Sequence, residues 1–452
     1  MRSINPASGT PIRDYPEHTQ VEVTALVERA GAVFRSWSAH PAAERTVFLR
    51  QVARALRARL ADHARLMTTE MGKPIVAAEA EAEKCALTCD WFADHAPALL
   101  EPEPAATEAR ASFVRFDPLG VVLAVMPWNF PFWQVFRCAA PALAAGNTVV
   151  LKHASNVPGC ALAIEQVFRE AGLPEGAFTT LLVPARAVGE IVAHPAVRAV
   201  SLTGSEPAGR QLAALAGAAL KKTVLELGGS DAFLVLADAD VEHAAAQAAV
   251  ARTVNSGQSC IAAKRFLVEE PVAERFEAAL IERMATLRVG DPLERATQVG
   301  PLARADLLEE LENQVGRTVQ AGATLALGGR RLDRPGFYFP PTVLTGVEPG
   351  MPAFDEETFG PVAAVTRARD PDHALELANR SRYGLGASVW TADISRGQEL
   401  AARLEAGAVF VNEMVKSDPR VPFGGVKCSG YGRELAAFGL REFVNVKTVW
   451  VR

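Results

Sequence analysis

Short apolar runs alternate with helical stretches through the middle of the chain. Between the runs, the residues at 159–172 and 207–220 place apolar side chains at the three- and four-residue spacing of a helix. The runs themselves are rich in Val and Leu, which is typical of strands buried on both faces, and lie at 147–152, 179–183, 197–204 and 222–228. This alternation predicts a doubly wound parallel sheet, whose ligands bind beyond the C-terminal ends of the strands.

The same alternation begins again near Ser230. Apolar runs separated by helical stretches follow at 232–237, 264–270, 361–368, 386–390 and 407–412. The fold class is therefore expected to be α/β, with two doubly wound Rossmann-like domains, the second spanning 230–428. Most of the first hundred residues have helical periodicity instead, and 42–71 carries its arginines on the face opposite the apolar one.

Two segments fall outside these patterns. A break rich in Pro and Glu at 101–107 leads into extended residues up to 120, and the residues at 442–451 resemble a strand. A strand needs a partner, and a second copy of the chain would provide one. We therefore expect 101–120 and 429–452 to form a small β arm in a homodimer or homotetramer, with the first domain built from 1–100 and 121–229.

Composition narrows the class of protein. The 452 residues are 49% hydrophobic and 22% charged, with a net charge of -5, so no basic excess suits a nucleic acid. Six scattered cysteines without a Cys-x-x-Cys pair indicate a reducing compartment. The N-terminal residues show no signal-peptide pattern, and the longest apolar stretch, 120–128, is too short to cross a bilayer. A cytoplasmic protein without membrane or metal partners is expected.

Four local sequences could carry chemistry. Cys260 lies in a small polar loop, where a thiolate nucleophile could meet a substrate, although single cysteines are commonly structural. Glu226 ends an apolar run, so partial burial could make it a general base, or it could be a cap. Asn129 could donate to an oxyanion or cap a turn. The segment TGSEPAGR at 203–210 follows a strand and opens a helix, as phosphate-binding turns do.

Together these segments resemble the aldehyde dehydrogenase superfamily over nearly the whole chain. The separation of 34 residues between Glu226 and Cys260 (260 − 226) matches the family's spacing of base and nucleophile. The shared motifs occur in the family's order: PWNFP (127–131), LK (151–152), TGS (203–205), LELGG (225–229), GQSC (257–260), EETFGPV (356–362) and PFGGVKCSGYGRE (422–434).

The resemblance implies a role for each matching residue. Cys260 would attack an aldehyde, Asn129 and the backbone N–H of Cys260 would hold the oxyanion, and Glu226 would activate water. The first domain would bind a nicotinamide cofactor and the second would carry the nucleophile. The residues implied at the cofactor are Trp128, Lys152, Ser155, Gly204, Ser205, Leu227, Glu357 and Phe359.

One departure from the family bears on the cofactor. Many members have Glu three residues after the motif lysine, where it accepts the adenosine 2′-hydroxyl and repels a 2′-phosphate. This chain has Ser155 there, beside Lys152 and next to His153, which could also contact a phosphate or lie at the rim of its site. A neutral donor beside a cation favours NADP over NAD.

The substrate can be argued from Arg137. An arginine on the helix after Asn129 would point into the substrate tunnel, where it would pair either with a substrate carboxylate or with an acidic residue of the protein. The succinate-semialdehyde dehydrogenase branch resembles this chain at Arg137, and the resemblance also implies Ser417 and Trp133 at the substrate. Val254 replaces a second arginine of some members, so glutarate semialdehyde or neutral aldehydes remain alternatives. A CoA-acylating dehydrogenase and a cysteine hydrolase are further alternatives.

Overall fold

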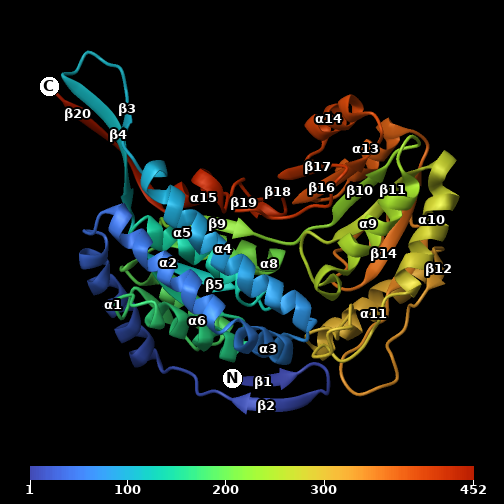
Figure 1. The fold of residues 1–452 in the computed structure, drawn as a ribbon, viewed down its shortest axis with the longest axis horizontal. Helices are drawn as coiled ribbons and strands as arrows, with labels where there is room; N and C mark the ends of the chain where they lie inside the picture. The colour runs from blue at the N-terminus through green and yellow to red at the C-terminus, as the bar shows by residue number, and fades with distance from the viewer.

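The computed structural model describes all 452 residues, and two large sheets dominate it (Figure 1). The first sheet has six strands, and all of them except the edge strand β19 run parallel. In spatial order they are β19 (Gly430–Tyr431), β9 (Lys222–Glu226), β8 (Val197–Thr203), β5 (Val121–Met126), β6 (Thr148–His153) and β7 (Phe178–Thr180). The expected run at 179–183 is thus a strand only at its start.

Both faces of the first sheet are buried, as the apolar runs predict. Val149 packs into the core on one face and its neighbour Val150 into the core on the other, because side chains alternate along a strand. The helices on the first face are α2 (Ala42–Ala58), α3 (Leu60–Met71), α4 (Ile75–Leu99), α5 (Trp133–Ala144) and α6 (Pro158–Glu170). Those on the second are α1 (Gln20–Trp37), α7 (Val188–Ala193) and α8 (Glu206–Ala218). The expected helical stretch at 42–71 is divided at Arg59.

The second sheet has seven strands, all parallel except the edge strand β12. In spatial order they are β12 (Thr324–Leu327), β13 (Thr342–Thr345), β14 (Val362–Ala368), β11 (Ala263–Glu269), β10 (Asp231–Val235), β16 (Gly386–Trp390) and β17 (Ala408–Val411). Around it lie α9 (Val241–Thr253), α10 (Glu270–Ala285), α11 (Ala305–Gln320), α12 (Pro352–Asp355), α13 (Pro371–Asn379) and α14 (Ile394–Arg403). Along the chain, the first strand of this sheet is β10, which begins at Asp231.

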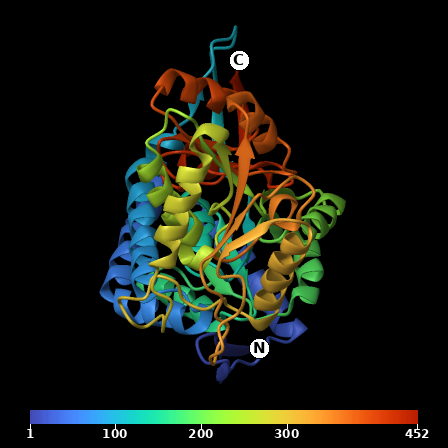
Figure 2. The same ribbon diagram turned by 90° about the vertical axis from the view of Figure 1, so that its right-hand side faces the viewer.

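A three-stranded arm projects from the body, as both ribbon views show (Figures 1 and 2). It contains β3 (Glu103–Pro104), β4 (Ala111–Pro118) and β20 (Val444–Val451), with β4 in the centre and all pairs antiparallel. Residues 429–452 are not all in the arm, however. Strand β19 pairs with β9 of the first sheet, and α15 (Ala436–Glu442) packs on α4 and α5. Residues 430–442 therefore pack with the first sheet and not with the arm, because β19 forms an edge strand of that sheet.

The remaining elements are short. They are the hairpin β1 (Arg2–Asn5) and β2 (Thr10–Asp14), the pair β15 (Tyr383–Gly384) and β18 (Val426–Lys427), and two 3-10 turns at Ala185–Ala187 and Val254–Gly257. None of the helices has the length and apolar character needed to cross a membrane. The domain boundaries themselves stay a prediction.

Candidate active site

A cleft of about 630 Å³ opens between the two α/β units. Its first wall is formed by the loops after β5, β8 and β9, at the C-terminal ends of parallel strands, where doubly wound sheets bind their ligands. Its second wall comes from α11 and from the loop at 355–359. Eight of the residues predicted from the sequence line this cleft: Trp128, Asn129, Gly204, Ser205, Leu227, Cys260, Glu357 and Phe359.

Cys260 lies on a loop whose backbone is tightly determined. Asn255 and Ser256 have left-handed φ values of 55° and 57°, and Gly257 follows at 76°. A Cβ on Gly257 would lie 2.3 Å from the backbone of Gly360, so the two motif glycines allow their loops to touch. Nonglycine residues in this region store strain, which is common where a functional side chain must be aimed. The loop thus presents Cys260 to the cleft.

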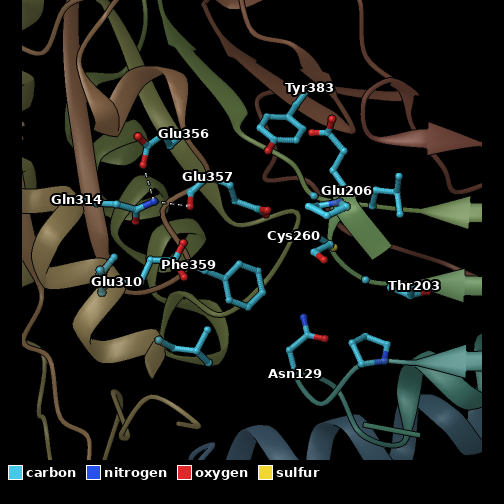
Figure 3. Close-up of a pocket in the computed structure, with 18 of the residues that line it drawn as sticks. Asn129, Thr203, Glu206, Cys260, Glu310, Gln314, Glu356, Glu357, Phe359 and Tyr383 are labelled. Carbon is cyan, nitrogen blue, oxygen red and sulfur yellow. Dashed lines mark hydrogen bonds between the residues drawn. The ribbon is translucent and has the colours of Figure 1, made fainter. Parts of the chain in front are cut away.

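Asn129 turns its amide toward Cys260 (Figure 3). Its Nδ2 donates to the backbone carbonyl of Gln258 at 3.1 Å, and the backbone carbonyl of Asn129 accepts a hydrogen bond from Asn255 Nδ2 at 2.7 Å. One amide proton is therefore used to fix the side chain, and Nδ2 carries a second proton. Such a held donor beside a nucleophile is what an oxyanion requires.

Lys264 is a functional candidate that the sequence reasoning missed. Its buried ammonium donates to the carbonyls of Ser259 at 3.0 Å and Cys260 at 2.9 Å, and lies 3.7 Å from Glu357 Oε1. Burial lowers the pKa of Lys264, while Glu357 raises it. A lysine four residues after the candidate nucleophile was the available signal. It ties the Cys260 loop to the carboxylate predicted at the nicotinamide ribose.

The thiol of Cys260 is protonated at neutral pH in this environment. Burial raises its pKa to about 12, although Arg137 and Lys264 act in the opposite direction. A nucleophilic attack therefore needs a base that takes the proton.

Glu226 is buried at the end of β9, below the residues that line the cleft. Neither carboxylate oxygen has a hydrogen-bond partner. Burial raises the pKa of Glu226 well above its usual value, and Arg137, whose Nη2 lies 4.0 Å from Oε2, opposes this. A buried carboxyl without hydrogen-bond partners and with a raised pKa holds a proton more readily than an ordinary carboxyl, which suits a general base.

Arg137 pairs with an acidic residue of the protein, which is one of the two alternatives that the sequence leaves open. Its guanidinium forms an ion pair with Glu434, donates to Thr203 Oγ1 at 3.3 Å and lies over the ring of Phe423. Arg137 is 1% exposed, and no part of it is on the cleft wall. Burial of a guanidinium without a counter-charge is costly, and Glu434, which follows β19, supplies that counter-charge.

The other substrate candidates lie away from the cleft wall but touch a common residue. Ser417 Oγ accepts a hydrogen bond from Lys84 Nζ at 2.7 Å, and the same ammonium lies 4.1 Å from the ring centre of Trp133. Lys84 was not predicted as a site residue. It lies on α4, where the neighbouring Cys85 is buried among apolar side chains.

The cofactor candidates beyond the cleft wall differ in exposure. Lys152 is buried at the end of β6 and has no acidic partner within 4 Å, while Ser155 is exposed. His153 is not at a rim: it is buried, its Nε2 donates to the carbonyl of Pro131 at 2.8 Å, and burial lowers its pKa to about 4. Its buried position fits neither of the two alternatives that the sequence leaves open, contact with a phosphate or a place at the rim of its site.

The same cleft contains features suited to a dinucleotide. Helix α8 begins at Glu206 without a side-chain cap, so its first N–H groups are free for an anion next to Gly204 and Ser205. Phe359, on the second wall, packs edge-on against Trp128 of the first wall, and the centres of the two rings are 5.7 Å apart. Tyr383, Arg382 and Gln314 also line the cleft and were not predicted, because they come from distant parts of the chain.

Residues 1–449 match the sequence model of the aldehyde dehydrogenase family, to which the chain belongs. It is 52% identical to the probable succinate-semialdehyde dehydrogenase [NADP(+)] of Synechocystis, covering 100% of this chain and 99% of that one. It is 49% identical to the succinate semialdehyde dehydrogenase [NAD(P)+] Sad of Escherichia coli, covering 99% and 97%. A crystal structure of succinic semialdehyde dehydrogenase from Streptococcus pyogenes with NADP+ superimposes with a TM-score of 0.97 at 36% identity, covering 100% and 99%.

Proposed function

We propose that this protein oxidises succinate semialdehyde to succinate, with NADP or NAD as the hydride acceptor. The observation that carries the proposal is that the side chains of Cys260 and Asn129 line one cleft, together with Leu227, the residue that follows the buried Glu226. Relatives named for this reaction, at 49–52% identity over the full length, support the choice of substrate.

The residues of the cleft perform the covalent steps. The Cys260 sulfur bonds to the aldehyde carbon, its proton passes to a base, and the carbonyl electron pair moves to oxygen. Asn129 Nδ2 and the N–H of Cys260 donate to that oxygen. Loss of hydride from the same carbon leaves a thioester. Glu226 then removes a proton from water as the water attacks the thioester, and the sulfur of Cys260 leaves with its electron pair.

The cofactor proposed here fits the donors that the structure provides. Gly204, Ser205 and the uncapped start of α8 would hold the pyrophosphate, and Glu357 the nicotinamide ribose hydroxyls. Lys152 and Ser155 would meet the adenosine ribose and favour a 2′-phosphate, hence NADP. When bound, the nicotinamide supplies the hydride acceptor.

The β arm supports a homodimer or homotetramer. Strand β20 exposes large apolar side chains, with Val446 62% and Trp450 51% exposed, and a second copy could cover them. We place the reaction in the cytoplasm, where unpaired cysteines such as those of this chain are usual.

Initial rates of NADPH and NADH formation test the function. The assay compares succinate semialdehyde with butyraldehyde, which lacks the carboxylate, for the wild type and for Cys260→Ala. We expect a higher kcat/KM with the semialdehyde, and no turnover by Cys260→Ala. Equal use of both aldehydes would indicate a broad aldehyde dehydrogenase, and a requirement for CoA would indicate an acylating one. Hydrolysis of thioesters without aldehyde oxidation would favour a cysteine hydrolase.

A further inference from the structure

We propose that Lys84, held by Ser417 and Trp133, is the specificity-determining residue that binds the substrate carboxylate. The proposal rests on the function above and names the group that distinguishes a semialdehyde from a neutral aldehyde. It replaces Arg137, whose charge the protein itself neutralises through Glu434.

The Lys84 ammonium has a defined position. It donates to Ser417 Oγ at 2.7 Å and lies 4.1 Å from the ring centre of Trp133, so a hydrogen bond and a cation–π contact hold it in place. Lys84 belongs to α4, Trp133 begins α5, and Ser417 follows β17 of the second sheet. Three elements thus converge on one cation.

No carboxylate of the protein neutralises Lys84. No acidic oxygen lies within 4 Å of it, although it is half-buried. Two nearby carboxylates raise the pKa of Lys84, but each of them is paired with another group. Glu81 pairs with Lys73 and accepts the N–H groups of Phe132 and Trp133, while Asp418 forms an ion pair with Arg420 at 2.6 Å. A cation withdrawn from water without a partner is a site for an anion brought by a ligand.

The position of Lys84 suits a short substrate. Arg137, one turn after Trp133 on α5, donates to the hydroxyl of Thr203, which lines the cleft together with Cys260. Cys260 also packs against the same apolar cluster that contains Trp133. The proposal therefore requires that a four-carbon chain whose aldehyde carbon is at the Cys260 sulfur reach the Trp133 side of this cluster, where Lys84 lies.

The hydroxyl of Ser417 completes the recognition. Because it accepts from Lys84, its own proton is free to donate to an anion. A carboxylate between the two would receive one charge-assisted hydrogen bond from the ammonium and one from the hydroxyl. In this arrangement Ser417 has the role that the sequence predicts. The positive charge comes from Lys84 on α4, which the sequence did not indicate.

Steady-state kinetics of Lys84→Met test the proposal, since methionine keeps the length of the side chain without its charge. We expect kcat/KM for succinate semialdehyde to fall about 10- to 150-fold, and the value for butyraldehyde to stay within about twofold. Lys84→Arg should retain most of the preference. The matched control is Lys416→Met, which removes an exposed cation that pairs with Glu413 on the loop that carries Ser417. This variant should change neither value of kcat/KM.

Two different failures can be separated. If the wild type does not prefer the semialdehyde, the proposed function fails. If the wild type prefers it and Lys84→Met keeps that preference, the role of Lys84 is overturned. An equal loss with both aldehydes would make Lys84 structural and would also overturn the proposal. Succinate binding gives a second readout. It is measured as the rise in Tm that succinate causes, and Lys84→Met should abolish that rise.

Discussion

Arg137→Met removes the cation from a buried group of three charges. In the structure Arg137 pairs with Glu434 and stands 4.0 Å from Glu226 Oε2, and all three residues are at most 3% exposed. The substitution leaves two carboxylates facing each other in the interior without a cation. The pKa of Glu434 is already raised by burial, so this carboxyl is expected to take up a proton.

The expected cost follows from the geometry of the pair. Removing one partner of a buried ion pair costs about 3–5 kcal/mol. For 452 residues unfolding as one unit, each kcal/mol corresponds to about 1 °C, so Tm should fall by about 3–5 °C. The Cys260 thiol also loses a charge that lowers its pKa, and each unit of raised pKa reduces the thiolate about tenfold. Activity should therefore fall with both aldehydes together.

Thermal unfolding and kcat/KM with both aldehydes check this prediction for Arg137→Met, Glu434→Gln and the double variant. The double variant should be more stable than the sum of the single losses predicts, by about 0.5–3 kcal/mol, because the lost partners contact each other. A variant Arg137→Met with unchanged Tm and a loss confined to succinate semialdehyde would refute the reasoning. It would show that Arg137 reads the substrate carboxylate.

Three further predictions follow from the site. Ser155→Glu should place a negative charge where a 2′-phosphate would bind, and lower the ratio of kcat/KM for NADP over NAD at least about tenfold, whereas an unchanged ratio would remove Ser155 from the cofactor argument. Glu226→Gln should release about one equivalent of reduced cofactor per site and then stall as an acyl-enzyme, visible by stopped flow and mass spectrometry; steady full turnover would exclude Glu226 as the hydrolytic base. Burial and the charge of Arg137 lower the pKa of Lys84 to about 8. The preference for succinate semialdehyde over butyraldehyde should therefore be complete below that pH and decline above it, and a flat ratio from pH 7 to 9 would contradict a role for the Lys84 charge.

The sequence predicts the features that depend on local pattern. Apolar alternation locates the strands of both sheets, because a parallel strand is buried on both faces and leaves a continuous signature. Cys260, Asn129 and Gly204 were found because each lies in a short motif whose spacing is fixed by one loop. Eight such residues do meet on one cleft.

Contacts between distant segments could not be predicted in the same way. Nothing near Arg137 indicates that Glu434 will neutralise it, because that contact depends on how β19 returns to the first sheet. Likewise, the sequence around Lys84 has helical periodicity and gives no sign that Ser417 will reach it. The burial of His153 could not be predicted either, because its hydrogen bond to the Pro131 carbonyl depends on a loop from another part of the chain.

The pairing of β19 with β9 has a consequence for biosynthesis. Gly430 lies opposite Glu226, and Glu434 follows to neutralise Arg137, so the candidate base and its surroundings are completed by residues translated long after Cys260. A nascent chain in which the other strands of the first sheet and the Cys260 loop have already folded still lacks β19 and Glu434. The surroundings of Glu226 should therefore be completed only after residues up to 434 have left the ribosome, well after the segment that carries Cys260.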